Sequence, residues 1–305
     1  MSAPSYDTLS RLMSTPDAAG ADLFAAAVEL RDGFVRSEHL IGLLPGDAPA
    51  LLVAGLERAG ASGVVDAWLE LGRLLAYGAA PWAPYPAPDL RASVEAYREA
   101  DRMGSKAGAL GWIRAAYFAR SAEHATDAAR RLGELLATNP DDPEVLVLAG
   151  YLTHQGYGRQ ADPAEAVSYQ VAAAERGSAD AAFELSVLHA GGSGVPADQG
   201  ESLRWTFRAA ELGSARAMAN LGGMYATGRG VDRDPATALE WYAKAAEAGH
   251  AKAAYTAGVM LLTGDGGLAV DEARAERFLD LAEELGFDVD GALASIGLPR
   301  RAPTS

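Results

Sequence analysis

The chain has 305 residues, contains no cysteine and carries a formal net charge of −15 at pH 7. Without cysteine it cannot form disulfides, use a catalytic thiol or hold metal through sulfur, which suits a reducing cytoplasm. The negative charge argues against a nucleic-acid backbone or an anionic membrane as the main partner, because both require clustered lysine and arginine.

The N-terminal part fits no repeat and is predicted to be a short helical cap over residues 1–62. Its start lacks a basic region followed by an apolar stretch, so no signal peptide is expected. Residues 1–20 contain prolines and small polar residues and are expected to be frayed. Three short helices are predicted to follow, over residues 21–30, 37–44 and 47–59, the last capped by Asp47.

Residues 63–142 are predicted to form two degenerate helical hairpins. Asp89 can begin one of their helices, and Asn139-Pro140 marks a strong break at their end. Between the helices lies Pro81 to Pro88, in which four prolines impose an extended path. Trp82 and Tyr85 on this segment can either bind a partner or, as is more common, attach the loop to neighbouring helices.

A regular repeat follows. Trp205 returns as Trp241 and Gly192-Ser-Gly194 returns as Gly228-Arg-Gly230, at a constant spacing of 36 residues. A fixed period of this length is typical of a stacked array. The spacing predicts four repeats over residues 143–178, 179–214, 215–250 and 251–287, the last with one extra residue before its second helix. Residues 288–305 are expected to form a C-terminal capping helix and a tail.

The residues of one repeat explain its two helices. Ala217, Leu221 and Met224 follow helical spacing and form an apolar stripe, next to Gly222, which allows a close approach of the second helix. Asp234 is predicted to cap that second helix, with a proline at its first position. One such hairpin cannot bury its apolar face alone, so neighbouring repeats must cover it.

The pattern resembles the Sel-one-like (Sel1-like) repeat, a relative of the tetratricopeptide repeat. In residues 215–250 the resemblance rests on Leu221-Gly222, Gly228-Arg-Gly230-Val231, Trp241-Tyr242 and Ala245-Ala246-Glu247. It is looser before residue 143 and absent from residues 1–60. The resemblance implies an all-α fold, a right-handed α-solenoid of stacked helix-turn-helix repeats. Some members of the family are secreted and rich in disulfides, whereas this chain is similar to the cysteine-free bacterial type.

No motif indicates an active site, so the chain is predicted not to be an enzyme. The glycine pairs follow helices and lack a Gly-Lys-Ser or Gly-Lys-Thr sequence, which argues against a phosphate-binding loop. The five histidines lack metal-binding spacing, and no Gly-x-Ser-x-Gly elbow is present. We therefore predict no cofactor and no metal.

In the related tetratricopeptide solenoid, the first helix of each repeat lines the concave face. The resemblance implies the same arrangement in this chain. The residues expected to bind a partner are Trp112, Glu144, Val147, Tyr151, His154, Asp180, Phe183, Val187, Arg216, Asn220, Lys252, Tyr255 and Val259. Acidic residues gather at the earlier end of this predicted groove and basic ones at the later end. Exposed aromatic residues and arginine are typical of binding hot spots. The alternative is that some of these side chains pack between repeats.

The sequence thus predicts a cytoplasmic scaffold or adaptor that binds a peptide or protein segment in the concave groove. The alternative is an immunity-like or regulatory subunit that controls a partner enzyme through its acidic outer surface. No nucleic-acid or membrane partner is expected, and the sequence does not indicate an oligomeric state.

Overall fold

The computed structural model describes residues 4–36, 46–78 and 88–298, and these residues fold into α-helices without a strand. None of the helices in these ranges is both long and apolar enough to cross a membrane. The chain divides into two compact units. One comprises Met1–Pro140 with Gly156–Gln160, and the other comprises Asp141–Gln155 with Ala161–Ser305.

The first unit contains seven of the described α-helices. In chain order they are α1 (Pro4–Met13), α2 (Gly20–Arg36), α3 (Ala48–Ala61), α4 (Val65–Tyr77), α5 (Leu90–Arg102), α6 (Lys106–Phe118) and α7 (Ala125–Thr138). Asp89 caps α5 as predicted, because its carboxylate accepts hydrogen bonds from the backbone N–H groups of Arg91 and Ala92. Trp82 and Tyr85 lie outside the described residues.

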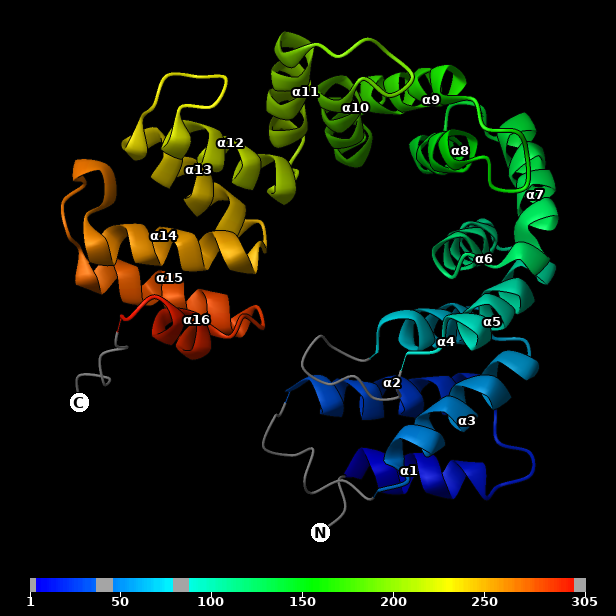
Figure 1. Cartoon of the computed structure of the whole chain (residues 1–305). Helices are drawn as coiled ribbons and strands as arrows, with labels where there is room; N and C mark the ends of the chain where they lie inside the picture. Colours follow the sequence, from blue (N-terminus) through cyan, green and yellow to red (C-terminus); the bar gives the residue numbers. More distant parts are fainter. Residues whose placement is uncertain (1–3, 37–45, 79–87, 299–305) are drawn as a thin grey trace. The chain divides into compact units, whose positions relative to one another are not determined.

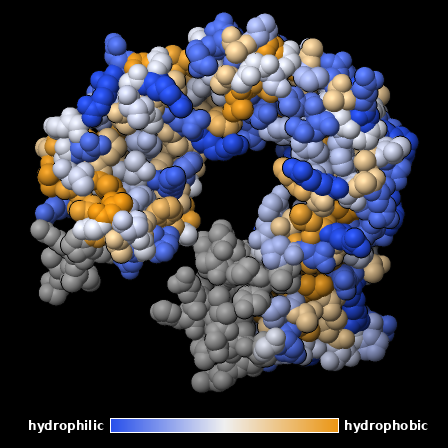
Figure 2. Space-filling model, viewed as in Figure 1, coloured by the Kyte–Doolittle hydropathy of each residue, from blue (hydrophilic) through white to orange (hydrophobic). Residues whose placement is uncertain are grey.

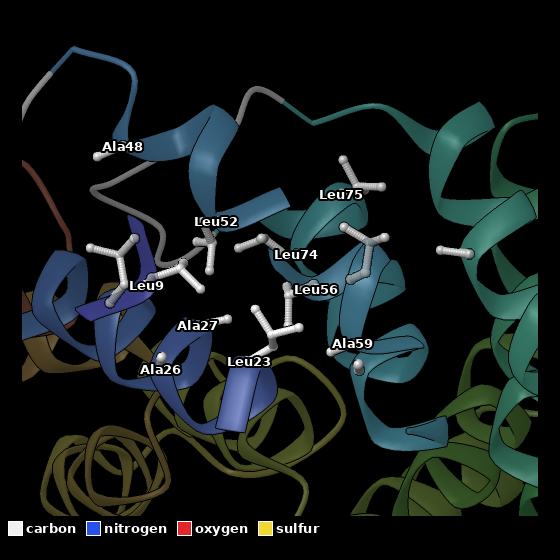
Figure 3. Packing of buried hydrophobic residues seen from close by; sticks show 14 residues of the cluster. Leu9, Leu23, Ala26, Ala27, Ala48, Leu52, Leu56, Ala59, Leu74 and Leu75 are labelled. Carbon is white, nitrogen blue, oxygen red and sulfur yellow. The ribbon is translucent and has the colours of Figure 1, made fainter. Parts of the chain in front are cut away.

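The helices α1, α2 and α3 share one apolar core, in which Leu9, Leu23, Leu52 and Leu56 point toward one another (Figure 3). The expectation that residues 1–20 are frayed is therefore wrong for the described residues 4–20, since Leu9 of α1 is completely buried. A helix this short is stable when its apolar residues pack against other helices, which its own sequence does not reveal.

Two further expectations for the N-terminal region concern the cap of α3 and the helix before it. Asp47 does not cap α3 with its side chain. Its carboxylate instead accepts a hydrogen bond from the hydroxyl of Tyr6, with 2.8 Å between Tyr6 Oη and Asp47 Oδ1. The helix expected over residues 37–44 lies outside the described residues.

The second unit contains the regular hairpins (Figure 1). Its helices are α8 (Pro143–Gln155), α9 (Pro163–Glu175), α10 (Ala179–Gly191), α11 (Gln199–Glu211), α12 (Ala215–Thr227), α13 (Pro235–Glu247), α14 (Ala251–Thr263), α15 (Glu272–Glu284) and α16 (Val289–Ser295). The even-numbered helices from α8 to α14 are the first helices of the repeats, and α9, α11, α13 and α15 are the second helices. Each second helix up to α13 packs against both its own first helix and the next one. The predicted all-α solenoid of helix pairs is confirmed.

Capping residues recur with the period of the repeat. The second helices begin after Asp162, Asp198, Asp234 and Asp271, whose carboxylates accept backbone N–H groups of the first turn. The first helices α10, α12 and α14 begin after Ser178, Ser214 and His250, whose side chains do the same. Asp271 comes one residue late, which accommodates the predicted extra residue.

Two glycines of the third repeat serve different purposes. Gly228 ends α12 in the left-handed conformation, with φ at 77°, which side chains other than glycine rarely adopt. Gly222 lies under the ring of Tyr242, and a Cβ atom there would be only 2.8 Å from Tyr242 Cδ1. The close approach of α13 to α12 therefore requires glycine at position 222.

We expect Ser214→Ala to lower the free energy of unfolding by about 1 kcal/mol, because an N-cap hydroxyl is lost. The Ser214 Oγ accepts the backbone N–H of Ala217, with 3.3 Å between the two heavy atoms. Urea denaturation followed by circular dichroism measures the change. Ser168→Ala is the control, because Ser168 is exposed within α9 and caps nothing. Equal losses for the two variants would contradict the capping role.

Candidate protein-binding surface

Eleven of the predicted binding residues lie on α8, α10, α12 and α14 with their side chains exposed or half-buried. The exposed ones are Glu144, Asp180, Val187, Arg216, Asn220 and Lys252, and the half-buried ones are Val147, Tyr151, His154, Tyr255 and Val259. We call these eleven residues, together with Glu184 described below, the first-helix surface. Val187 is the most exposed large apolar residue among them, at 49%.

Phe183 and Trp112 do not belong to this surface, although the sequence pattern included them. Phe183 is 6% exposed, and the guanidinium of Arg216 lies 4.2 Å from its ring centroid. Trp112 lies in the first unit, is 3% exposed, and donates its indole N–H to Asp101 at 2.9 Å. Both rings are covered by side chains from other helices, so neither presents its face to a partner.

Glu184 joins the surface as a residue that the sequence pattern did not include. It lies on α10, one residue after Phe183, and its side chain is half-buried. Burial raises the pKa of its carboxyl group, while the nearby charges of His154 and Arg216 lower it in part. The sequence does contain a signal for Glu184, because Glu184 stands 36 residues before Asn220, one of the predicted binding residues.

These contacts bring the earlier part of the surface together. His154 of α8 is hydrogen-bonded to Ser193, with 2.8 Å between Nε2 and Oγ. The charges of His154 and Arg216 both act on the carboxyl group of Glu184. In the same region Arg216 covers Phe183. Three successive first helices therefore contribute side chains to this region.

The later end of the surface is more apolar. Tyr255 of α14 packs on Phe287, with 4.9 Å between the ring centroids. Burial raises the pKa of the Tyr255 hydroxyl. Tyr255 and Val259 both pack against an apolar cluster that includes Val289 and Leu293 of α16. This end therefore packs with helix α16 rather than with the residues around Glu184.

Three charged or polar members stand apart from these contacts. Glu144, Asn220 and Lys252 are exposed on α8, α12 and α14. Within the described ranges, none of their side chains takes part in a hydrogen bond or an ion pair. Their positions are available to a partner without the loss of an internal contact.

A pocket lies between the second helices α9 and α11. This pocket of about 820 Å³ is lined by apolar residues, including Val171 and Trp205, and by His189 of α10. Two ion pairs stand at it, Arg204 with Glu201 at 2.6 Å and Arg208 with Glu211 at 3.2 Å. Arg204 also stacks on Trp205, at 4.6 Å from its ring centroid.

The face seen in Figure 2 carries its hydrophobic residues in separate spots among hydrophilic ones. A mixed surface of this kind suits recognition by a few apolar anchors and surrounding charges. Among the residues that the structure describes, no cluster of three or more histidine, aspartate or glutamate side chains is arranged to hold a metal ion.

Comparison with protein families identifies the regular part of the chain. A model described as Sel1 repeat matches residues 143–178, 179–214, 215–250 and 251–287. These are the four repeats predicted from the 36-residue spacing, and the resemblance to this family is confirmed. No curated protein matches the chain.

Several solved structures are similar to this chain, and the first of these shows the same fold. A Sel1 repeat protein from Oxalobacter formigenes is 24% identical, with a TM-score of 0.56, and the match covers 96% of this chain and 85% of that one. A protective antigen of uropathogenic Escherichia coli with an SLR fold is 20% identical, with a TM-score of 0.48 and coverage of 95% and 68%. An immunity protein from Pseudomonas aeruginosa is 18% identical, with a TM-score of 0.44 and coverage of 95% and 91%.

Proposed function

Since residues 143–287 are four Sel1 repeats, a fold that generally serves as a protein-interaction scaffold, we propose that this chain is a non-catalytic scaffold that binds a peptide or protein segment on its first-helix surface. The four equivalent first helices each expose side chains of this surface to solvent. The observation that carries the proposal is Val187, a large apolar side chain left 49% exposed beside the residues around Glu184. Tyr151 and Val259 occupy the equivalent positions in the first and fourth repeats.

We expect Val187→Asp and Tyr151→Ala to weaken partner capture while the helical circular-dichroism signal is kept. A buried aromatic anchor at an interface contributes about 2 kcal/mol or more, which corresponds to about thirty-fold in affinity. Affinity purification of the full chain and of each variant, followed by quantitative mass spectrometry, measures which proteins are lost.

Glu240→Lys is the control for these variants, because Glu240 is exposed on the second helix α13. Proteins that the control keeps and the two first-helix variants lose support the proposal. The proposal is contradicted if Val187→Asp and Tyr151→Ala capture the same proteins as the wild type.

The pocket between α9 and α11 favours a second candidate, a regulatory subunit that controls a partner enzyme through its acidic outer surface. The pocket combines an apolar wall with two ion pairs, an arrangement that an interface can use. Arg208→Glu separates the two candidates, because Arg208 is exposed and stands at the pocket, away from the first-helix surface. Loss of the partner with Arg208→Glu, together with its retention by Val187→Asp, would favour the regulatory subunit.

A further inference from the structure

One position on the first-helix surface is charged in all four repeats, and the sign of its charge changes along the array. Glu144, Asp180, Arg216 and Lys252 stand at equivalent positions of the four repeats, 36 residues apart, and all four are exposed. The first two repeats are therefore acidic at this position and the last two are basic. A segment lying across these helices meets opposite charges at its two ends.

Glu184 adds a deeper negative group to the acidic half. Its side chain is half-buried, and within the described residues it has neither a hydrogen bond nor an ion pair. The two neighbouring side chains have other contacts, since Arg216 stacks on Phe183 and His154 is hydrogen-bonded to Ser193. A carboxylate that is partly removed from water and lacks a donor gains more from an incoming cation than an exposed carboxylate does.

We propose that Glu184 receives an arginine or lysine side chain of the bound segment, whose basic part lies over α8 and α10 and whose acidic part lies over α12 and α14. This inference rests on the proposed function and names the chemistry of the partner. Val187, three residues after Glu184 on the same helix, offers an apolar contact for the aliphatic stem of the cationic side chain. Charge-assisted hydrogen bonds to the carboxylate then fix the register of the segment.

Short random peptides displayed on phage provide the probe, selected on the immobilised full chain. We expect the selected peptides to share an arginine or lysine, and we expect acidic residues toward one end. Selection on Glu184→Gln should remove the shared cationic residue. Selection on Glu240→Gln should leave it in place, because that variant makes the same chemical change on the second helix α13.

A double-mutant cycle then tests the contact itself. For one selected peptide, Glu184→Gln and replacement of the shared arginine or lysine by glutamine should each weaken binding at least about tenfold. The two changes together should cost little more than either alone, because each removes the same interaction. Isothermal titration calorimetry measures all four affinities.

The outcomes separate this inference from the proposed function. One contrary result is that the selected peptides lose binding to Val187→Asp and yet share no cationic residue, and another is that they bind Glu184→Gln with unchanged affinity. Either result overturns the role of Glu184 and leaves the scaffold proposal intact. Fully additive losses in the cycle also overturn it. Peptides that are indifferent to Val187→Asp, or the absence of any selected peptide, count against the first-helix surface and against the inference with it.

Discussion

Leu221→Asp is expected to lower the free energy of unfolding by about 4 kcal/mol or more, enough to unfold the repeats around it. Leu221 is completely buried in α12, which packs on α11 and α13. Aspartate at this position places a charge among apolar side chains with no partner. Urea denaturation followed by circular dichroism measures the loss.

Val187→Asp is the matched control for this prediction, because it introduces the same side chain on the equivalent helix of the preceding repeat. Val187 is 49% exposed, so the new carboxylate stays hydrated there. We expect a change within about 0.5 kcal/mol, as is usual for surface substitutions. Denaturation midpoints that agree for the two variants would contradict the register in which α12 packs.

Deletion of residues 215–250 is expected to give a folded but less stable chain, whereas deletion of residues 215–232 is expected to give aggregates. The first deletion removes one complete repeat and joins Ser214 to Ala251, so Ser214 takes the place of His250 as the cap of α14. The second removes α12 alone and leaves the apolar face of α13 without its partner. Stacked repeats depend on nearest-neighbour contacts, so only removal of a complete repeat leaves every remaining helix with a partner.

Size-exclusion chromatography and thermal melts distinguish the two products of these deletions. A monomeric peak with a cooperative melt is expected for the longer deletion, and loss of the monomeric peak for the shorter one. If both chains fold alike, contacts between repeats are not what stabilises the second unit.

Local sequence signals were sufficient to predict the fold of the repeats. Asp234 and Pro235 begin α13 because capping and proline geometry act within one turn. Gly222 marks a close helix approach because a Cβ atom would collide with Tyr242. Leu9 shows the limit of such signals. Its burial depends on contacts with α2 and α3, and the local sequence pattern does not reveal these contacts.

The candidate surface was less predictable, since exposure depends on neighbouring repeats. Phe183 has the spacing of an exposed aromatic residue, but it is buried, and Arg216 from the next repeat lies over its ring. Trp112 is similarly removed from the surface by its contact with Asp101. Glu184 occupies the position equivalent to Asn220 one period earlier, so the repeat spacing alone also indicates Glu184.

The short helix α16 has a consequence for assembly. Its Val289 and Leu293 are buried against Leu279 and Ala282 of α15, at the point where another repeat would otherwise stack. A solenoid end without such a cover offers its apolar face to any chain that presents a complementary one. Such a contact is head-to-tail and does not close on itself, so it propagates into filaments. We therefore propose that α16, a helix of seven residues, keeps this face of α15 from stacking on another chain.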